Sequence, residues 1–500
     1  MNRILIANRG EIALRIIRSL REMNIETVAV YSDADQYAPH VNAADFAIGL
    51  GPGPSTESYL RMDAIIEGAK QLQVEGIHPG YGFLSENAVF AEKVTQAGIT
   101  FIGPSPESIR TMGSKLAAKE AVAAYNTPLI PGTAEAITDK DDAKRIATEI
   151  GYPVLIKASA GGGGKGMRIV EQEADFDQQI EMAMSEAQNA FGDASVFLEK
   201  FVLDPRHIEI QVLCDQHGNR LYLHERECSI QRRHQKVVEE APSALLTPEL
   251  RKAMGESAVR VAESCNYIGA GTVEYLVDRD MNFYFLEMNT RLQVEHPVTE
   301  LITGLDLVKE QVKVARGEAL NLTQKDVKLQ GHAMELRVYA EDPLNNFLPD
   351  IGTLEHYEKP EGPGVRVDDG FEEGMEIPIF YDPMISKLIV YGNSREEAIH
   401  RMKRAIKEYR ISGVKNTLSF GSFVMEHPEF AKGNFTTHFV DEHFTPQVQS
   451  LKEQANHKHE PWLEDLGKLG ATLIGKSDDK PVQNVSVAKA SSNWSSQRRR

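Results

Sequence analysis

The sequence predicts an α/β protein with an N-terminal parallel sheet, a mobile glycine-rich lid and a C-terminal region of mixed α and β structure. Three features support this prediction. Strand-like apolar runs alternate with helical patterns over the first hundred or so residues, as in parallel α/β sheets. Four consecutive glycines lie between two short β-rich runs. Farther along, two more β-rich runs, 272–276 and 283–287, flank a polar turn.

The N-terminal part begins with a buried strand followed by an amphipathic helix over residues 3–20. Asn8 and Glu11 have the spacing of a capping box, which marks the junction. Strands and helices then alternate, at 27–31, near Gly76, at 88–96 and near Phe101. We expect a Rossmann-like sheet, but the absence of GxGxxG after the first strand argues against a dinucleotide cofactor. The glycine-rich aromatic run at 78–87 favours a simple turn.

Composition limits the class of protein and its partners. A chain of 500 residues is long enough for two to four domains. A formal net charge of -18 argues against nucleic acid as a partner, because no basic face dominates. The three cysteines form no metal-binding spacing. No apolar run reaches membrane-spanning length, and polar residues interrupt the N-terminus too early for a signal peptide. We therefore expect a soluble, cytoplasmic protein.

The glycine run lies between expected strands at 153–157 and 167–170, which makes it the tip of a hairpin. The Walker pattern GxxxxGK[ST] is absent, because Lys165 is followed by glycine and no helix follows directly. Consecutive glycines let backbone N–H groups come close to phosphate oxygens. A flexible exposed loop would explain the glycines alone, but strand-end Lys157 and nearby Lys165 favour a phosphate-binding flap.

The polar turn between the later β-rich runs predicts an antiparallel hairpin with a candidate metal site. If the turn is centred on Asp280 and Met281, Glu274 lies directly opposite Glu287, and the two carboxylates repel unless a cation separates them. Mg²⁺ accepts such oxygen ligands together with substrate phosphates. In an extended chain the following alternate polar residues would share the face of Glu287; they are Asn289, Arg291, Gln293 and Glu295. A solvated strand face would explain any one of these residues, but the ordered row favours a functional site.

Residues 287–300, EMNTRLQVEHPVTE, resemble the signature of biotin carboxylases, which belong to the ATP-grasp superfamily. The resemblance extends from about Ile4 to about Phe444 and implies an α+β ATP-grasp fold. The domains it implies are an N-terminal domain at 1–113, an ATP-grasp domain at 114–330 with its lid at about 131–202, and a C-terminal domain at 331–444. Residues 445–500 form a polar tail, for which a disordered linker and a partner-docking helix are both open.

The same resemblance implies the ligands of the site. ATP would bind with two Mg²⁺ or Mn²⁺ ions, and the metal ligands would be Glu274, Glu287 and Asn289. The strand at 196–202 would contact adenine, with Glu199 accepting from its amino group. The implied nucleotide-binding residues are Lys115, Lys157, Gly163, Gly164, Glu199, Lys200, Val202, His207, Gln231, His234, Glu274 and Glu287. For the basic cluster around His234, a solvated face is the alternative to polyphosphate binding.

The resemblance also implies the chemistry. Glu295 would act as the base on bicarbonate, and ATP would then convert bicarbonate to carboxyphosphate. Breakdown to CO2 and phosphate would let phosphate remove the N1 proton of biotin, and Arg337 would stabilise the biotin enolate. The implied bicarbonate-binding residues are Lys236, Arg291, Gln293 and Val294, and the implied catalytic residues are Arg291, Glu295, Lys236 and Arg337.

Two other functions are weighed against biotin carboxylation: another ATP-grasp carboxylate–amine ligase, and a catalytically silent nucleotide-binding scaffold. The chain has no AMKM-like biotinylation site, so biotin is expected on a separate carrier protein. The resemblance also implies a homodimer and a separate carboxyltransferase partner. The final carboxyl acceptor, whether acetyl-CoA, another acyl-CoA or pyruvate, is not defined by the sequence.

Overall fold

The computed structural model describes residues 1–133, 135–158, 167–191, 193–233 and 235–452. The chain separates into two units, Met1–Pro446 and Gln447–Arg500. Most of the predicted polar tail, residues 453–500, lies outside the described residues. The elements below belong to the first unit.

The N-terminal sheet is five-stranded and fully parallel, and the parallel arrangement was predicted. Its strands are β1 (Arg3–Ile6), β2 (Glu26–Tyr31), β3 (Phe46–Gly49), β4 (Gly76–His78) and β5 (Thr100–Phe101). Their order is β3-β2-β1-β4-β5. The helices of this part are α1 (Gly10–Glu22), α2 (Pro39–Ala43), α3 (Met62–Gln71), α4 (Ala88–Gln96) and α5 (Pro106–Gly113). Central β1 is buried because apolar residues cover both of its faces, as parallel strands require.

The predicted capping box at the start of α1 does not form. The residue before the helix is Arg9, and no side chain caps it. The Asn8 amide instead donates from Nδ2 to the carbonyls of Pro79 and Tyr81, both at 2.8 Å. A Cβ at Gly80 would lie 2.9 Å from that Nδ2, so glycine permits the close approach. Asn8 therefore ties the aromatic run to the end of β1, a long-range contact that local spacing cannot reveal.

The lid contains a three-stranded antiparallel sheet with helices packed against it. Its elements are β6 (Val154–Ala158), β7 (Met167–Val170), β8 (Val196–Lys200), α7 (Lys140–Ile150) and α8 (Phe176–Phe191), preceded by α6 (Lys115–Ala123). The strand order is β7-β6-β8. The strands β6 and β7 form the predicted hairpin. The glycine run at its tip lies outside the described residues.

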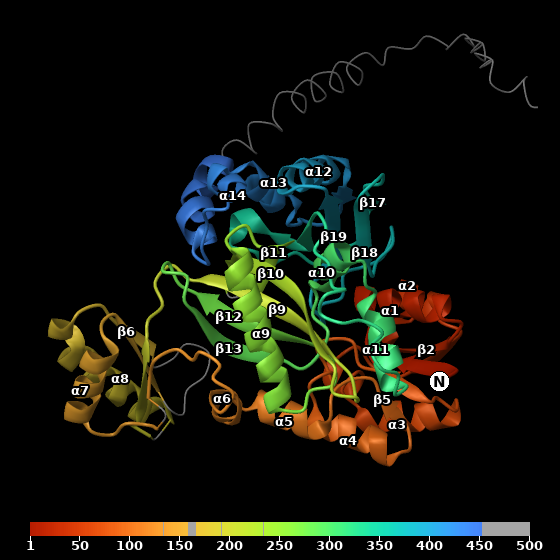
Figure 1. The fold of residues 1–500 in the computed structure, drawn as a ribbon. Helices are drawn as coiled ribbons and strands as arrows, with labels where there is room; N and C mark the ends of the chain where they lie inside the picture. The colour runs from red at the N-terminus through yellow and green to blue at the C-terminus, as the bar shows by residue number, and fades with distance from the viewer. Residues whose placement is uncertain (134, 159–166, 192, 234, 453–500) are drawn as a thin grey trace, which may run out of the picture. The chain divides into compact units, whose positions relative to one another are not determined.

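A single eight-stranded antiparallel sheet follows, in the order β13-β12-β9-β10-β11-β14-β19-β18. These strands are β9 (Arg206–Cys214), β10 (Arg220–Arg232), β11 (Gln235–Ala241), β12 (Gly269–Val277), β13 (Phe283–Asn289), β14 (His332–Tyr339), β18 (Val365–Asp369) and β19 (Met384–Gly392). The associated helices are α9 (Pro248–Ser264), α10 (His296–Thr303) and α11 (Leu307–Ala315). Helix α9 packs across β9 and β10 (Figure 1). Strands from both sides of residue 330 therefore share one sheet.

The β12–β13 hairpin has the predicted pairing of Glu274 with Glu287, reached through a different register at the turn. Next to the turn, Val277 pairs with Phe283, which centres the turn on Asp280 alone. An irregularity between the Glu274 and Tyr275 pairings then leaves Leu286 as an extra residue in β13. This bulge shifts the register by one residue and brings the two glutamates opposite each other.

The remaining C-terminal elements surround the end of the large sheet. Two small sheets pair β15 (Glu341–Asp342) with β16 (Leu348–Pro349) and β17 (His356–Glu358) with β20 (Arg410–Ser412). The helices are α12 (Arg395–Glu408), α13 (Leu418–Glu426) and α14 (Pro428–Lys432).

Candidate active site

Four charged residues form a row across neighbouring strands of the large sheet. Glu209 of β9 is in register with Arg226 of β10 on one side and with Glu274 of β12 on the other. Glu287 of β13 continues the row, opposite Glu274. Residues directly opposite each other project from the same sheet face. Three glutamates thus occupy adjacent strands on one face, with an arginine at one end.

Lys236 of β11 supplies a cation to this acidic row. Its Nζ donates to Oε1 of Glu274 at 2.9 Å and to Oε1 of Glu295 at 2.7 Å, and also to Glu209. Burial alone would lower the pKa of Lys236, but the surrounding carboxylates outweigh burial and raise it. The ammonium group therefore stays charged at neutral pH and joins Glu209 and Glu274 of the row to Glu295.

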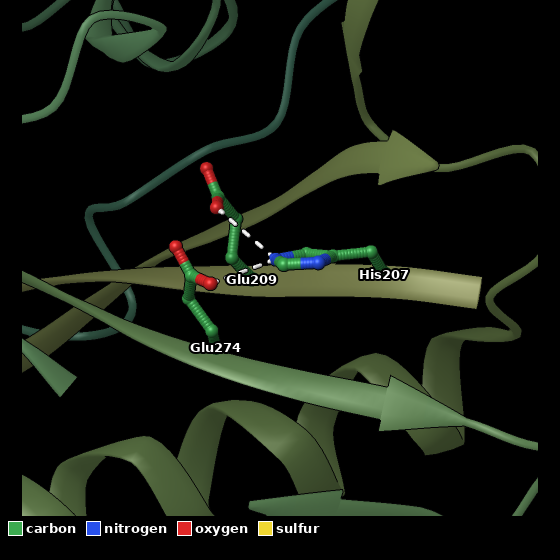
Figure 2. A group of neighbouring side chains, drawn as sticks. All are labelled: His207, Glu209 and Glu274. Atoms are coloured by element: carbon green, nitrogen blue, oxygen red, sulfur yellow. Dashed lines mark ion pairs between the residues drawn. The ribbon is translucent and has the colours of Figure 1, made fainter. Parts of the chain in front are cut away.

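His207 lies against the same acidic row (Figure 2). Its Nε2 is 2.9 Å from Oε2 of Glu274 and 4.0 Å from Oε2 of Glu209. The ligand atoms of these three residues lie within 4.8 Å of one another. Imidazole and carboxylate are both metal-ligand types. His207, which is predicted to contact the nucleotide, thus lies beside Glu274, which is a predicted metal ligand.

The polar residues after β13 reach the site by a backbone path that differs from the predicted extended row. The strand ends at Asn289, and residues 290–295 belong to no strand or helix. The side-chain amides of Asn289 and Gln293 nonetheless donate to Oε1 of Glu274, at 2.9 and 2.8 Å. Asn289 and Gln293 thus converge on Glu274, but the predicted continuous extended row is wrong, because the strand ends at Asn289.

Arg291 is held by contacts from two parts of the chain. Its Nη2 donates to Oδ1 of Asn289 at 3.0 Å, and its Nε donates to Oε2 of Glu86 at 2.7 Å. Burial would lower the pKa of Arg291, but Glu86 raises it. Glu86 belongs to the run 78–87, so this run positions a guanidinium of the site in addition to turning the chain.

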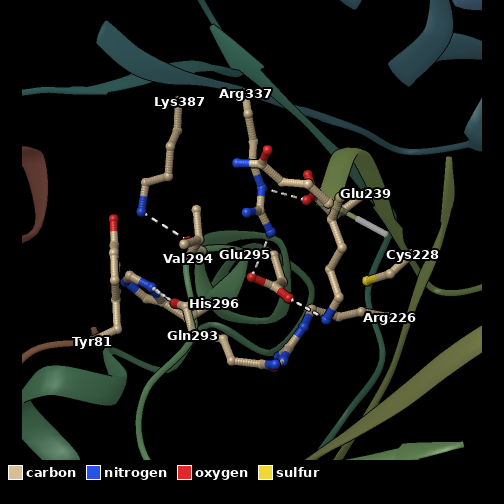
Figure 3. A network of polar contacts seen from close by, with 12 residues as sticks. Tyr81, Arg226, Cys228, Glu239, Gln293, Val294, Glu295, His296, Arg337 and Lys387 are labelled. Carbon is tan, nitrogen blue, oxygen red and sulfur yellow. Dashed lines mark hydrogen bonds and ion pairs between the residues drawn. The ribbon is translucent and has the colours of Figure 1, made fainter. Parts of the chain in front are cut away.

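Glu295 lies at the start of α10, between two cations. Its Oε1 accepts from Lys236. Its Oε2 accepts from Nη2 of Arg337 at 3.0 Å (Figure 3). Arg337 also donates from Nε to Oε1 of Glu239 at 2.6 Å. Burial alone would raise the pKa of Glu295, but Lys236, Arg337 and Arg226 lower it. Glu295 is therefore a buried carboxylate that stays ionised at neutral pH.

Glu287 lies at the more exposed end of the row. Burial and the facing Glu274 raise the pKa of its carboxyl, and Lys115 opposes this. A raised carboxyl pKa beside a second carboxylate indicates a site that a cation would stabilise. Oxygen donors from Glu274, Glu287 and Asn289 match the ligand preference of Mg²⁺. The residues present thus fit the predicted metal.

Two lid side chains predicted to bind ATP, Lys157 and Glu199, contact each other. Lys157 of β6 donates to one carboxylate oxygen of Glu199 in β8, and Nζ of Lys119 donates to the other at 2.7 Å. Lys200 donates to two backbone carbonyls after α7, at 2.7 and 2.9 Å. The Glu199 carboxylate thus has two cationic partners here, and its contact with adenine stays a prediction.

The remaining predicted nucleotide residues are spread over several elements. Lys115 begins α6 and is exposed, whereas Val202 and Gln231 are buried. Nε2 of Gln231 donates to the carbonyl of Cys228 at 2.7 Å. Gly163, Gly164 and His234 lie outside the described residues.

Comparison with known proteins identifies the family. The model of the biotin carboxylase N-terminal domain matches residues 1–109, and that of the biotin carboxylase C-terminal domain matches 335–442. Between them, the ATP-binding domain of the carbamoyl-phosphate synthase large chain matches 114–323. The chain belongs to the biotin carboxylase family. Because both flanking domains are those of biotin carboxylases, the alternative of a different carboxylate–amine ligase is not supported.

Similar proteins of this family are components of larger carboxylases. A pyruvate carboxylase subunit of Methanothermobacter thermautotrophicus is 53% identical over 88% of this chain and 90% of its own length. The propionyl-CoA carboxylase alpha chain of Ruegeria pomeroyi is 51% identical over 89% of this chain and 68% of its own. The human mitochondrial propionyl-CoA carboxylase alpha chain is 53% identical over 88% of this chain, which spans 61% of that relative.

Solved biotin carboxylase structures share the fold. The biotin carboxylase domain of a thermophilic 2-oxoglutarate carboxylase bound to bicarbonate has a TM-score of 0.85 at 46% identity, over 89% of this chain and 98% of its own. A Campylobacter jejuni biotin carboxylase complexed with a β,γ-ATP ligand has a TM-score of 0.81 at 46% identity, over 88% of this chain and 99% of its own. The chain is accordingly an ATP-dependent ligase of the biotin carboxylase type. In the part of the chain that the structure describes, no helix is long and apolar enough to cross a membrane.

Several residues that the biotin carboxylase fold brings into the site are absent from the set predicted from the sequence: Glu86, Glu209, Arg226, Glu239 and Lys387. A signal for Glu209 was present, because it follows His207 by two residues and shares its strand face. The others meet the site through contacts between distant segments, such as Glu86 with Arg291. No local pattern identifies such contacts.

Proposed function

We propose that this chain carboxylates biotin on a separate carrier protein, using ATP, bicarbonate and Mg²⁺ or Mn²⁺, with Glu295 as the base. The observation that carries the proposal is the position of buried, ionised Glu295 between Lys236 and Arg337. A base beside two cations is suited to an anionic substrate, because the cations neutralise the charge that the substrate brings.

In the first step, Glu295 would take the proton of bicarbonate while a bicarbonate oxygen attacks the γ-phosphorus of ATP. ADP leaves, and carboxyphosphate forms. Lys236, Arg291, Gln293 and the backbone at Val294 would bind the bicarbonate. Support comes from the hydrogen bond between Lys236 and Glu295, and from the contacts by which Gln293 and Arg291 join the same polar network.

In the second step, carboxyphosphate would break down to CO2 and phosphate. Phosphate would take the N1 proton of biotin, and N1 would then attack CO2. Arg337 would stabilise the enolate that biotin forms when N1 loses its proton. Support for this role is that Nη2 of Arg337 donates to Oε2 of Glu295, the proposed base, at 3.0 Å. Nε of the same guanidinium donates to Oε1 of Glu239.

Glu274, Glu287 and Asn289 would hold two divalent ions. When bound, such ions would neutralise the polyphosphate charge that develops during phosphoryl transfer. The chain's own part is to keep the two carboxylates opposite each other across β12 and β13. The remaining nucleotide contacts are proposed at Lys115, Lys157, Gly163, Gly164, Glu199, Lys200, Val202, His207, Gln231 and His234.

We also propose the assembly in which the reaction occurs. The partners would be a biotin carboxyl carrier protein and a carboxyltransferase subunit, with the chain itself a homodimer in the cytoplasm. One similar structure, the biotin carboxylase domain of Hydrogenobacter thermophilus 2-oxoglutarate carboxylase, is described as a dimer. The names of the relatives make pyruvate and acyl-CoA esters the candidate acceptors. Isolation of the native complex and identification of its biotinylated component would test this assembly.

The central experiment replaces Glu295 with glutamine. We expect Glu295→Gln to lower bicarbonate-dependent ATP hydrolysis, measured with free biotin, by about 10²- to 10⁴-fold, as for loss of a positioned base. Nucleotide affinity should stay within about threefold, because the amide keeps the shape of the side chain. The matched control is Glu263→Gln, an exposed glutamate of α9. An unchanged hydrolysis rate in Glu295→Gln would exclude this residue as the base.

A further inference from the structure

Lys387 of β19 is a fully buried lysine that has no assigned part in the reaction. Its Nζ donates to the carbonyl of Val294 at 2.9 Å (Figure 3). The same Nζ lies 3.1 Å from Oε2 of Glu11 and 3.9 Å from Oδ2 of Asp368. A buried ammonium group is costly unless it is paired, so these contacts explain how the fold tolerates it.

Lys387 is also the direct neighbour of Arg337 in the sheet, because the two residues are paired between β19 and β14. Like charges directly opposite each other are destabilising. Both cations nevertheless contact the same short segment. Arg337 contacts the side chain of Glu295, and Lys387 contacts the backbone of the preceding residue, Val294.

That segment has no regular secondary structure to hold it. Residues 290–295 lie between the end of β13 and the start of α10, so no strand ladder fixes their carbonyls. The Val294 carbonyl and the Glu295 N–H belong to one planar peptide group. A hydrogen bond to that carbonyl therefore restricts rotation of the whole peptide group. Because the Glu295 Cα is bonded to this group, the direction in which the Glu295 side chain leaves the backbone is restricted as well.

We propose that Lys387 is a positioning residue for bicarbonate: by holding the Val294 carbonyl, it keeps the Val294 backbone and the Glu295 carboxylate directed at this substrate. The inference rests on the proposed function, which makes Val294 and Glu295 the groups that meet bicarbonate. Lys387 itself is fully buried, so its proposed role is exerted through the Val294 backbone.

The test distinguishes the bond to the carbonyl from the ion pair, because one variant removes both and the other removes only the ion pair. Lys387→Met replaces the lysine with an unbranched apolar side chain of similar length. Asp368 keeps its partner in this variant, because Arg366 donates to it at 2.7 and 3.0 Å. The matched control is Glu11→Gln, which removes the charge opposite Lys387 but keeps an acceptor. Burial already raises the pKa of Glu11, so a neutral side chain is compatible with that position. If Lys387→Met does not fold, the double variant Lys387→Met with Glu11→Gln removes both charges together.

We expect Lys387→Met to raise the bicarbonate KM about tenfold, in line with the loss of one buried charged hydrogen bond. ATP affinity, measured by equilibrium binding, should change less than about twofold. Glu11→Gln should keep its bicarbonate KM within about threefold of the original. A merely structural role for Lys387 would lower stability without this selective change in the bicarbonate KM.

The inference is overturned if folded Lys387→Met has an unchanged bicarbonate KM, or if Glu11→Gln raises that KM equally. If the unmodified protein shows no bicarbonate-dependent ATP hydrolysis, the proposed function fails first. Amide hydrogen exchange of residues 288–298 then tests the backbone contact by itself. Exchange should be faster in Lys387→Met than in Glu11→Gln, and equal exchange would refute the role of Lys387 in holding this segment.

Discussion

At the scale of single residues, the site consists of buried charges that stabilise one another. Arg226 is wholly buried and donates to Glu209, Gln211, Thr272, Gln293 and Thr299. Removing one member of such a group leaves its partners buried and unpaired, which is more costly than loss of the pair itself. A substitution such as Arg337→Ala therefore needs a control that removes a comparable buried pair elsewhere.

Arg337→Ala should impair biotin carboxylation much more than ATP binding. Its guanidinium contacts Glu239 and Glu295, and loss of one preorganised charge donor typically costs about 10²- to 10³-fold in rate. We expect a loss of this size in the carboxylation of free biotin, with the ATP dissociation constant within about threefold. The control is Arg251→Ala, which takes an arginine from buried Glu225 in another part of the sheet. Equal losses in carboxylation and ATP binding would defeat this assignment.

Glu287→Gln should increase the requirement for divalent metal. The variant keeps the size of the side chain but removes one of two facing carboxylates, so the free Mg²⁺ concentration for half-maximal ATP turnover should rise at least about tenfold. Removing metal with a chelator should stop turnover in the unmodified protein, and added Mg²⁺ should restore it. If Glu287→Gln and Glu263→Gln respond identically to Mg²⁺, Glu287 is not a metal ligand.

At the scale of elements, strand register brings the acids together. Each of β9, β12 and β13 contributes one glutamate to the same row, and the bulge at Leu286 sets the last pairing. A shift of one residue would turn Glu287 to the opposite face. On one side of this sheet, helix α9 packs tightly across β9 and β10.

Gly255→Ala tests that packing in α9. Alanine is the better helix former by about 1 kcal/mol, so an exposed position would gain stability. At this buried position, however, a Cβ would lie 2.6 Å from Cδ2 of Tyr222 in β10. We expect a net loss of about 1–3 kcal/mol in the free energy of unfolding, measured in urea. The exposed neighbour Glu256→Ala should change stability by less than about 0.5 kcal/mol. A more stable Gly255→Ala protein would contradict this account.

At the scale of the whole first unit, the eight-stranded sheet joins the site to the C-terminal elements. Glu240 of β11 illustrates the connection: it accepts from His332 of β14 at 2.6 Å and from Arg395 of α12 at 2.7 and 3.0 Å. Arg395 in turn donates to carbonyls of α14. The buried Glu240 carboxylate therefore links three elements, and Arg395 extends the connection to α14.

The pH dependence of stability should report on Glu240. Burial would raise its pKa, but the hydrogen bond from His332 and the charge of Arg395 lower it to about 2. Because the folded pKa is the lower one, the stabilisation is present above pH 4.5 and is lost as pH falls from about 4.5 to about 2. We expect this lowering of the Glu240 pKa to contribute about 3 kcal/mol to the free energy of unfolding above pH 4.5. The stability advantage over Glu240→Gln, measured by urea unfolding, should shrink across this range, and a constant difference would refute the assignment.

Much of the fold followed from local pattern. The alternation of apolar runs predicted the parallel N-terminal sheet, and the spacing of Glu274 and Glu287 predicted their pairing. The sheet prediction succeeded because burial of strand faces depends on neighbouring residues, whereas the glutamate pairing arises through the bulge at Leu286, which was not predicted. The signature after Glu287 likewise located the segment that carries Glu295, the proposed base.

Other parts of the site depend on segments that lie far apart in the chain. Asn8 resembled a helix cap but bonds the loop around Gly80, and Gln293 reaches Glu274 from a segment that belongs to no strand. Lys387 meets Val294 across 93 residues of chain. Residue spacing can specify which side chains share a strand face, because that is a local property of the backbone. It cannot specify which buried cation pairs with which carboxylate, because that choice is made only when distant strands pack and exclude water.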